Sequence, residues 1–403
     1  MAKKKDLPSE QERSETEDFT NELIASLNRD LGEQVAYNLL SDTSPTHIKR
    51  WISTGSRQLD YIVSNRAGGG LPEGRIVEIF GPPSIGKSHI AAQIAKSVQH
   101  MGGIAVYIDT ENATNPENLV ALGVDIGKRF VYVDTHCTEE VFDIAEKTIL
   151  KAKALSKNIP IVIIWDSVAA SSPKAELDGE YEQNSIGLQA RTISKGMRKI
   201  TGVIGDQNVL FVCLNQTRSK IGGYVLGDGI TVPGGVAIPF HASVRIKLGA
   251  GSQIKDSKGT VIGIHVSAKT IKNKVAPPFR ACNFRIYFGV GIVEHEEIFD
   301  ILREHGPDLV DNHQVEIKGA GAYKHLIVSN ESGQLFDKSF YKAGFDEIMV
   351  DEKYSKWIDG LLGKAMTRSA VTKDDVEIDH ESYEEIRAVA DLVAEESNNI
   401  SPE

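Results

Sequence analysis

The chain has 403 residues, of which 41% are hydrophobic and 25% are charged, and its formal net charge is −11. This composition excludes an intrinsically disordered chain, a collagen-like repeat and a small disulfide-stapled domain, and the length is typical of two or three domains. The charge is unevenly placed: residues 186–291 carry 15 basic and three acidic side chains, whereas residues 373–403 carry two basic and 11 acidic ones. A basic middle segment beside an acidic tail indicates a surface that binds a polyanion, with ordinary scatter of surface charge as the alternative.

The N-terminal region reads as a polar arm followed by a helix. Residues 1–16 are polar and charged, and apolar residues then recur at helical spacing from Phe19 to Leu31. This pattern predicts an amphipathic helix to about residue 40, ended by the linker 41–47. Its apolar face would pack either on its own domain or on a neighbouring subunit. No apolar stretch follows the N-terminal lysines and no run reaches 18 apolar residues, so we expect neither a signal peptide nor a membrane span.

The central part of the chain alternates strands and helices. Short apolar runs predict strands at 75–80, 104–109, 130–134, 160–166 and 209–215, with helices at 87–101, 139–155 and 188–204. Nearly continuous apolar strands separated by helices predict an α/β fold with a mostly parallel sheet covered on both faces. Three further runs, 243–249, 261–271 and 284–289, follow one another without helices and predict antiparallel additions to the same sheet.

The three cysteines are Cys137, Cys213 and Cys282. They are widely spaced and odd in number, and the last two lie in apolar or strand-like runs, so we expect buried, reduced thiols. No CxxC or HExxH spacing supports a structural metal site. The pattern favours a reducing, cytoplasmic location.

The segment GPPSIGKS, residues 81–88, fits the P-loop pattern G-x-x-x-x-G-K-[ST] between a predicted strand and a predicted helix. Its backbone N–H groups and the helix N-terminus would face phosphate oxygens. Lys87 would neutralise the β- and γ-phosphates of ATP and Ser88 would hold Mg²⁺. The alternative is a chance glycine-rich turn. The predicted nucleotide contacts are Gly81, Pro82, Pro83, Ser84, Ile85, Gly86, Lys87 and Ser88.

Carboxylates follow two other predicted strands. Asp166 ends the apolar run IVIIW, where it would orient Mg²⁺ beside Ser88 or serve only as a helix cap. The strand 104–109 continues into Asp109 and Glu111, either of which could face the γ-phosphate. A helix-capping or surface role for Glu111 is the alternative, and the spacing leaves both open.

The segment 215–235 follows another strand end and contains six glycines. Gln216 could sense the γ-phosphate, and Arg218 and Lys220 could reach nucleic-acid phosphates, although such loops are usually mobile connectors. A second candidate loop, residues 175–187, holds four acids and no base, so it is not a simple basic patch.

Several segments share one order along the chain: ISTGSRQLD (52–60), GGGLPEGRIVEIFGP (68–82), GPPSIGKS, the IDTEN strand end, WDSVAASSPKAEL (165–177), LNQTRSKIGG (214–223) and KNKVAPPF (272–279). In this order they resemble the bacterial RecA family of DNA strand-exchange recombinases. WDSVAA followed by SPKAEL is far more specific than any P-loop. The resemblance runs from about residue 52 to residue 292, and the divergent ends suggest a phage-encoded or otherwise distant member.

The resemblance implies a RecA-type ATPase core that forms a homo-oligomeric helical filament on single-stranded DNA, with ATP held between subunits. It implies DNA-dependent ATP hydrolysis coupled to homologous pairing and strand exchange with double-stranded DNA, in recombination, DNA repair and the SOS response. A single-strand-binding protein or a loader is a further implied partner. By this resemblance Glu111 is the catalytic carboxylate, Gln216 is the γ-phosphate sensor, and Lys272 and Lys274 reach the ATP of a neighbouring subunit.

The resemblance also places DNA in two loops, 178–187 and 217–235. Ile186 and Ile221 match apolar residues that wedge between base triplets. Contacts to the DNA backbone, which carry no sequence preference, are matched by Arg191, Ser194, Arg198, Arg218, Lys220, Gly222, Gly234 and Gly235. Departures from the family pattern are Ser88 for threonine, Val236 for asparagine, Pro239 for lysine, and Asn118 where an aromatic residue is common.

The predicted organisation is an arm and oligomerisation helix at 1–47, an ATPase core at 48–292, a small α+β domain at 293–372 and an acidic tail at 373–403. We interpret the tail as an electrostatic competitor for the DNA-binding surface, screened by salt and Mg²⁺. One alternative is a helicase-like or clock-type ATPase with the same core, although such proteins lack the WDSVAASSPKAEL and KNKVAPPF combination. Another is a non-catalytic recombination mediator, against which the intact P-loop and carboxylates argue.

Overall fold

The computed structural model describes residues 10–39, 44, 46–180, 187–219, 230–305, 313–319, 321–330, 332–350, 358, 360, 362–363 and 366–367. The chain divides into two units, Met1–Thr367 and Arg368–Glu403. The acidic tail and the polar arm up to residue 9 lie outside the described residues, as do residues 181–186 and 220–229 of the two predicted DNA loops. The predicted domain boundaries stay predictions.

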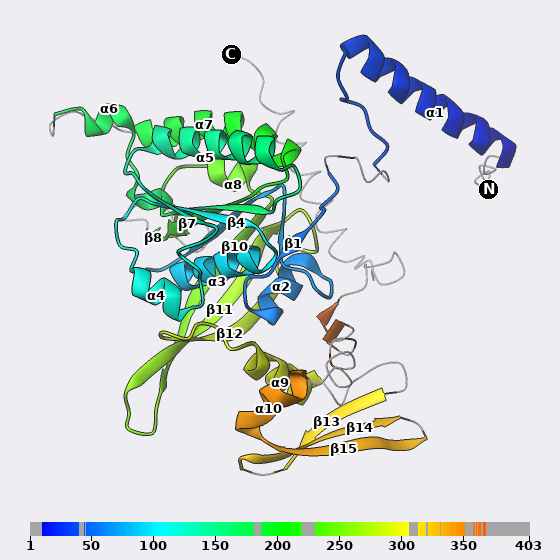
Figure 1. Ribbon diagram of the computed structural model, residues 1–403, viewed down its shortest axis with the longest axis vertical. Coiled ribbons are helices and arrows are strands. Elements are labelled where there is room, and N and C mark those ends of the chain that lie inside the picture. The colour runs from blue at the N-terminus through cyan, green and yellow to red at the C-terminus, as the bar shows by residue number, and fades with distance from the viewer. Residues whose placement is uncertain are drawn as a thin grey trace, which may run out of the picture. The chain divides into compact units, whose positions relative to one another are not determined.

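An eight-stranded sheet organises the core, in the order β12-β11-β10-β3-β7-β6-β4-β5 (Figure 1). The six strands from β10 to β5 in this order are parallel, and β11 and β12 add antiparallel pairs at one edge, which confirms the predicted α/β fold with a mostly parallel sheet. The strands are β3 Ile76–Gly81, β4 Ile104–Asp109, β5 Phe130–Asp134, β6 Ile161–Asp166, β7 Leu210–Gln216, β10 Val244–Lys255, β11 Val261–Asn273 and β12 Ala281–Tyr287.

The direction of β10 corrects one expectation. Residues 243–249 were expected as an antiparallel addition, but β10 pairs with β3 in parallel, with Val244 opposite Val77. The physical reason is the short helix α8, Ala237–His241, which lies between β7 and β10 in the chain. This connection carries the chain from the carboxyl end of β7 back to the amino end of β10. Parallel strands need such a crossover. Only β11 and β12 are antiparallel additions.

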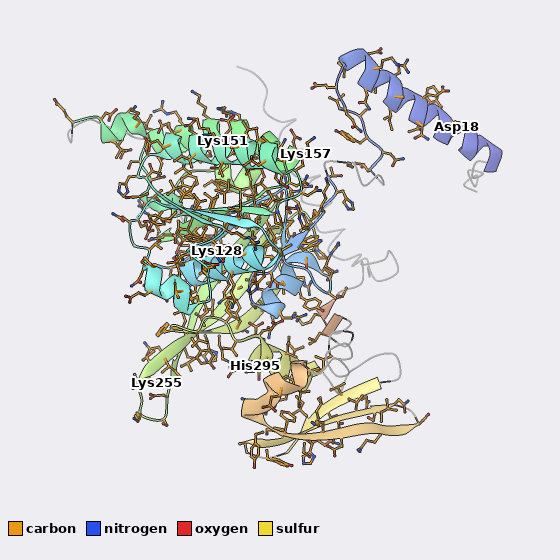
Figure 2. All side chains as sticks on the ribbon, in the orientation of Figure 1. Asp18, Lys128, Lys151, Lys157, Lys255 and His295 are labelled. Atoms are coloured by element: carbon orange, nitrogen blue, oxygen red, sulfur yellow. The ribbon has the colours of Figure 1, made fainter. Side chains whose placement is uncertain are left out.

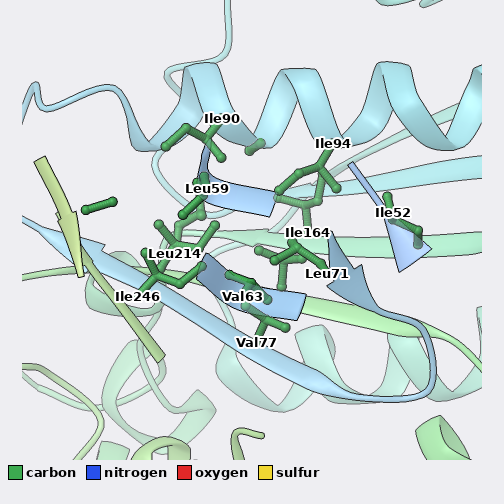
Figure 3. Packing of buried hydrophobic residues seen from close by; sticks show 14 of the residues in the cluster. Ile52, Leu59, Val63, Leu71, Val77, Ile90, Ile94, Ile164, Leu214 and Ile246 are labelled. Carbon is green, nitrogen blue, oxygen red and sulfur yellow. The ribbon is translucent and has the colours of Figure 1, made fainter. Parts of the chain in front are cut away.

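Helices cover both faces of the sheet. On one face α5 (Thr138–Leu155) and α7 (Leu188–Asp206) lie side by side, and α3 (Lys87–His100) covers the other (Figure 1). Side chains alternate along the strands, as a strand buried on both faces requires. In β6, Ile163 packs with the α5 and α7 cluster, whereas Ile164 belongs to the cluster under α3. Figure 3 shows the cluster under α3, with Ile90 and Ile94 of this helix above Ile164.

The N-terminal helix is shorter than expected. The helix α1 spans Glu10–Leu31, whereas the sequence predicted helix to about residue 40. Gly32 adopts a positive φ of 71°, and the Asn28 side chain accepts hydrogen bonds from the backbone N–H groups of Val35 and Ala36, both at 2.8 Å. This side-chain cap satisfies backbone groups beyond the last turn, and it ends the helix nine residues early.

Several short elements were not predicted. They are β1 Trp51–Ile52, α2 Arg57–Ser64, β2 Leu71–Pro72, α4 Pro116–Ala121, the 3₁₀ turn η1 Val168–Ala170, α6 Lys174–Leu177, β8 Arg218–Ser219 and β9 Ile230–Thr231. Caps specify two of these helices: the Ser56 side chain accepts from Leu59 N at the start of α2, and Asn115 caps α4 with Pro116 at its first position.

Residues beyond 292 form a three-stranded antiparallel sheet, β13 His313–Lys318, β14 Tyr323–Asn330 and β15 Gly333–Tyr341, in that order. The helices α9 (Glu294–His305) and α10 (Phe345–Val350) and the 3₁₀ turn η3 (Lys342–Gly344) accompany it. Its core contains Phe299, Leu326 and Phe340, together with Tyr61 of α2. This region therefore packs directly on α2.

All three cysteines are free and buried, which confirms the expected buried thiols. No helix among the described residues is long and apolar enough to cross a membrane. Lys128, Lys151 and Lys157 are exposed, and Figure 2 shows Lys151 and Lys157 at the margin of the core and Lys255 toward the end of the projecting β10–β11 hairpin.

Candidate nucleotide-binding site and family membership

The P-loop connects β3 to α3, as its sequence context predicted. Glycine is needed at two of its positions. A Cβ added to Gly81 would lie 2.7 Å from the carbonyl oxygen of Leu248, and Gly86 has a φ of 93° and faces Ile286 so closely that a Cβ would collide with that side chain. The loop is thereby held as a tight turn whose backbone can approach a ligand closely.

Lys87 lies in the first turn of α3 and is 7% exposed. Its Nζ donates hydrogen bonds to the carbonyl oxygens of Gly81 at 3.2 Å and Pro82 at 2.7 Å. Burial lowers the pKa of this ammonium, and the nearby carboxylates of Asp166 and Glu111 act in the opposite direction. The lysine is thus a cation enclosed by the loop, where a phosphate would be favoured.

Ser88 and Asp166 meet at the carboxyl edge of the sheet. The Ser88 Oγ donates to Asp166 Oδ2 at 2.8 Å, and the buried Tyr107 hydroxyl donates to the same oxygen. Burial raises the pKa of Asp166, and the hydrogen bonds from Tyr107 and Ser88 oppose this change. A hydroxyl and a carboxylate this close are the oxygen ligands that Mg²⁺ prefers, so these residues fit the predicted metal position beside the phosphates.

The structure separates the two candidate carboxylates after β4. Asp109 accepts hydrogen bonds from the backbone N–H groups of the following turn, at Glu111, Asn112, Ala113 and Thr114. Burial acts to raise the pKa of Asp109, but hydrogen bonds from the Thr114 side chain, from the backbone N–H groups of Thr114 and Glu111 and from the Tyr132 hydroxyl outweigh it, and the pKa is lowered. Asp109 therefore shapes the turn, and of the two carboxylates Glu111 remains the candidate for the predicted catalytic role.

Glu111 lies beside Gln216, although 105 residues separate them. The Gln216 Nε2 donates to Glu111 Oε1 at 2.8 Å, and the Ser167 hydroxyl donates to the same oxygen. Gln216 ends β7, which pairs with β3 so that Gly81 lies opposite Gln216. The carboxyl ends of β3, β4, β6 and β7 therefore bring together the P-loop, Glu111, Asp166 and Gln216, and this edge is where ligands bind in open α/β sheets.

Comparison with known proteins agrees with this geometry. Residues 19–293 match the family model of the RecA N-terminal domain. The chain belongs to the RecA family. Protein RecA of Chloroherpeton thalassium is 38% identical over 377 residues, which are 92% of this chain and 98% of that protein.

Two further relatives are more similar over shorter stretches. Protein RecA of Ruminococcus albus is 45% identical over 249 residues, 62% of this chain and 60% of that protein, so this match spans less than two thirds of its length. Protein RecA of Staphylococcus aureus is 42% identical over 260 residues, 64% of this chain and 71% of that protein. The chain is thus a RecA-family recombination protein, and the RecA resemblance seen in its motifs is confirmed.

The structure of this RecA-family chain does not bring Lys272 or Lys274 to its own P-loop. Lys272 pairs with Arg245 across β10 and β11, and its Nζ donates to the carbonyl oxygens of Pro239 at 2.7 Å and Phe240 at 2.8 Å. Burial lowers the pKa of Lys272, and the neighbouring Lys274 and Arg245 add to this effect. Within the described residues, no hydrogen bond or ion pair joins either lysine to residues 81–88.

The predicted DNA-contact residues fall into two groups. Arg191, Ser194 and Arg198 lie on α7, with the exposed Arg198 donating to Ser194 Oγ at 3.0 Å, and Gly234 and Gly235 approach the same helix with positive φ angles. Arg218 is exposed on β8. The remaining predictions, Ile186, Lys220, Ile221 and Gly222, lie outside the described residues.

Sequence reasoning missed two residues of the site, Ser167 and Tyr107. Ser167 follows Asp166 directly, and a polar residue at a strand end beside an acid was a usable signal. Tyr107 is the single hydroxyl-bearing residue in the apolar run IAVYID. A buried tyrosine hydroxyl needs a partner, and this requirement pointed to a polar group under the strand end.

Proposed function

We propose that this chain is an ATP-dependent recombinase that forms filaments on single-stranded DNA and catalyses homologous pairing and strand exchange, with DNA-dependent ATP hydrolysis. The observation that carries the proposal is the hydrogen bond between Gln216 and Glu111. It joins the candidate catalytic carboxylate to the residue that opens the glycine-rich loop 217–235. A nucleotide-dependent movement at the site would therefore reach a candidate DNA loop directly.

Each step of hydrolysis can be assigned to a residue of this chain. Residues 81–86 would cradle the phosphates, Lys87 would offset their charge, and Ser88 and Asp166 would hold Mg²⁺, which stabilises the charge that develops on the phosphate oxygens. Glu111 would accept a proton from the water that attacks the γ-phosphorus, while the bond to the β-γ bridging oxygen breaks and ADP leaves. Gln216 would orient Glu111 and sense the γ-phosphate.

Assembly would complete the site. Lys272 is held by the carbonyl oxygens of Pro239 and Phe240, and Lys272 and Lys274 supplied to a neighbouring subunit's site would make hydrolysis depend on filament formation. DNA would lie along the α7 residues and the two loops, where contacts to the phosphate backbone leave base pairing to select the homologous strand. Action in DNA repair and the SOS response, a cytoplasmic location, and a single-strand-binding or loader partner belong to the same proposal.

The test measures ATP hydrolysis with and without single-stranded DNA. We expect DNA to stimulate hydrolysis by the native chain and Lys87→Ala to abolish that stimulated hydrolysis. Lys151→Ala, a change at an exposed lysine of α5, is the matched control and should behave as the native chain. Unchanged turnover in Lys87→Ala would sink the assignment. Negative-stain images with a slowly hydrolysed ATP analogue should show filaments, and closed rings would favour a helicase-like ATPase instead.

A further inference from the structure

The Tyr107 hydroxyl contacts Asp166, a predicted ligand of Mg²⁺. The side chain lies on β4, is 1% exposed, and stacks on Phe130 with ring centroids 6.1 Å apart. Its hydroxyl donates a hydrogen bond to Asp166 Oδ2, the oxygen that also accepts from Ser88. No step of the proposed hydrolysis uses this residue.

The two hydroxyl groups that donate hydrogen bonds to Asp166 differ in how firmly their side chains are held. Ser88 lies in the first turn of α3, next to the predicted phosphate-binding loop, and its oxygen is itself a predicted Mg²⁺ ligand. Tyr107 is enclosed by the core and is held by ring packing, which keeps its hydroxyl on the carboxylate, and the Ser88 side chain lies within hydrogen-bonding reach of the same hydroxyl. Among the described residues, both side-chain hydrogen bonds to this carboxylate end on Oδ2. A fixed donor on one carboxylate oxygen restrains rotation of the group and orients the other oxygen.

We propose that Tyr107 is a positioning residue for Mg²⁺, acting through Asp166 to hold the carboxylate in the orientation that the metal requires. The inference rests on the proposed function, because the metal in question accompanies ATP. Tyr107 itself touches neither the nucleotide nor the metal in this scheme. Its effect should therefore be confined to the part of nucleotide binding that depends on Mg²⁺.

A second tyrosine on the next strand provides a matched control. The Tyr132 hydroxyl on β5 donates to Asp109 Oδ2 at 3.1 Å, and this side chain is 45% exposed. Asp109 already accepts four backbone N–H groups, so loss of one further donor leaves it restrained. Tyr132→Phe thus removes the same atom from an equivalent contact with a carboxylate that is not a predicted metal ligand.

The experiment measures the affinity of the full chain for a fluorescent ADP analogue, in EDTA and across a Mg²⁺ titration. We expect Tyr107→Phe to reduce the Mg²⁺-dependent gain in affinity by about tenfold or more, since loss of an outer-shell partner of a metal ligand typically costs 10- to 100-fold. Its affinity in EDTA should match that of the native chain. Tyr132→Phe should match the native chain in both conditions.

A double-mutant cycle with Asp166→Asn separates positioning from a general structural effect. If Tyr107 acts through Asp166, Tyr107→Phe should have no further effect on Mg²⁺ dependence in the Asp166→Asn background. Additive losses, an equal loss in EDTA, or native behaviour of Tyr107→Phe would each overturn the role given to Tyr107 while leaving the proposed function standing. A native chain that binds no nucleotide with Mg²⁺ would overturn both.

Discussion

Glu297 joins the C-terminal region to the start of α2 through a buried carboxyl group, and its ionisation should make the stability of the protein depend on pH. The residue lies on α9 and is 5% exposed. Its Oε2 accepts hydrogen bonds from Ser56 Oγ at 3.0 Å and Gln58 N at 3.3 Å at the start of α2, while Oε1 is buried and has no partner among the described residues. Burial raises the pKa of Glu297 to about 8, although the hydrogen bonds from Ser56 and Gln58 act to lower it.

The size of the effect follows from the pKa values. In the unfolded chain the carboxyl has its ordinary pKa of 4.5, so between pH 4.5 and about 8 the folded protein binds a proton that the unfolded chain releases. The stability from this group is therefore fully present below pH 4.5 and is lost as the pH rises through 8. The slope is at most about 1.4 kcal/mol per pH unit, or about 5 kcal/mol over the interval, which is large beside a typical domain stability of about 5–15 kcal/mol. Asp60, whose pKa burial raises to about 7, acts with the same sign.

The assay is urea unfolding followed by circular dichroism at several pH values between 5 and 8. Glu297→Gln keeps the size of the side chain and mimics the protonated acid, so its free energy of unfolding should fall less steeply with rising pH than that of the native chain. Glu304→Gln, at an exposed position of the same helix, should retain the native slope. Equal slopes in the native chain and Glu297→Gln would refute the reasoning.

Two further predictions concern the packing of α7 and the contact between Gln216 and Glu111. Gly196→Ala should lower the free energy of unfolding by about 1–3 kcal/mol, because an added Cβ collides with the Phe142 ring, whereas Gly202→Ala on the same helix meets open space and should raise it by up to about 1 kcal/mol. Thermal unfolding of both variants decides this, and changes of the same sign would contradict it. Gln216→Ala should lower DNA-stimulated ATP turnover about 10- to 100-fold, the equivalent of a charge-assisted hydrogen bond of about 1.5–3 kcal/mol to Glu111, with nucleotide binding retained. Native turnover in that variant would show that the contact does not serve hydrolysis.

Much of the architecture could be predicted because it depends on neighbours in the chain. The strand 104–109 was predicted with its observed bounds, since its apolar run is bounded on both sides by polar residues and turns. The P-loop lies within eight consecutive residues, so its spacing alone identifies it. The early end of α1 was missed because it depends on the Asn28 side chain folding back on residues 35 and 36, a contact that helical periodicity does not reveal.

The sequence by itself determined the P-loop, the alternation of strands and helices, and the RecA-family membership, because each is written in short segments. The tertiary structure decided which separated residues act together. Strand order places β7 and β6 between β3 and β4, and only this order brings Gln216 to Glu111 and Tyr107 to Asp166. It also decided that Asp109 shapes a turn while Glu111 stays available. Side chains meet across strands according to the pairing of the sheet, and pairing is a property of the whole fold that no local pattern contains.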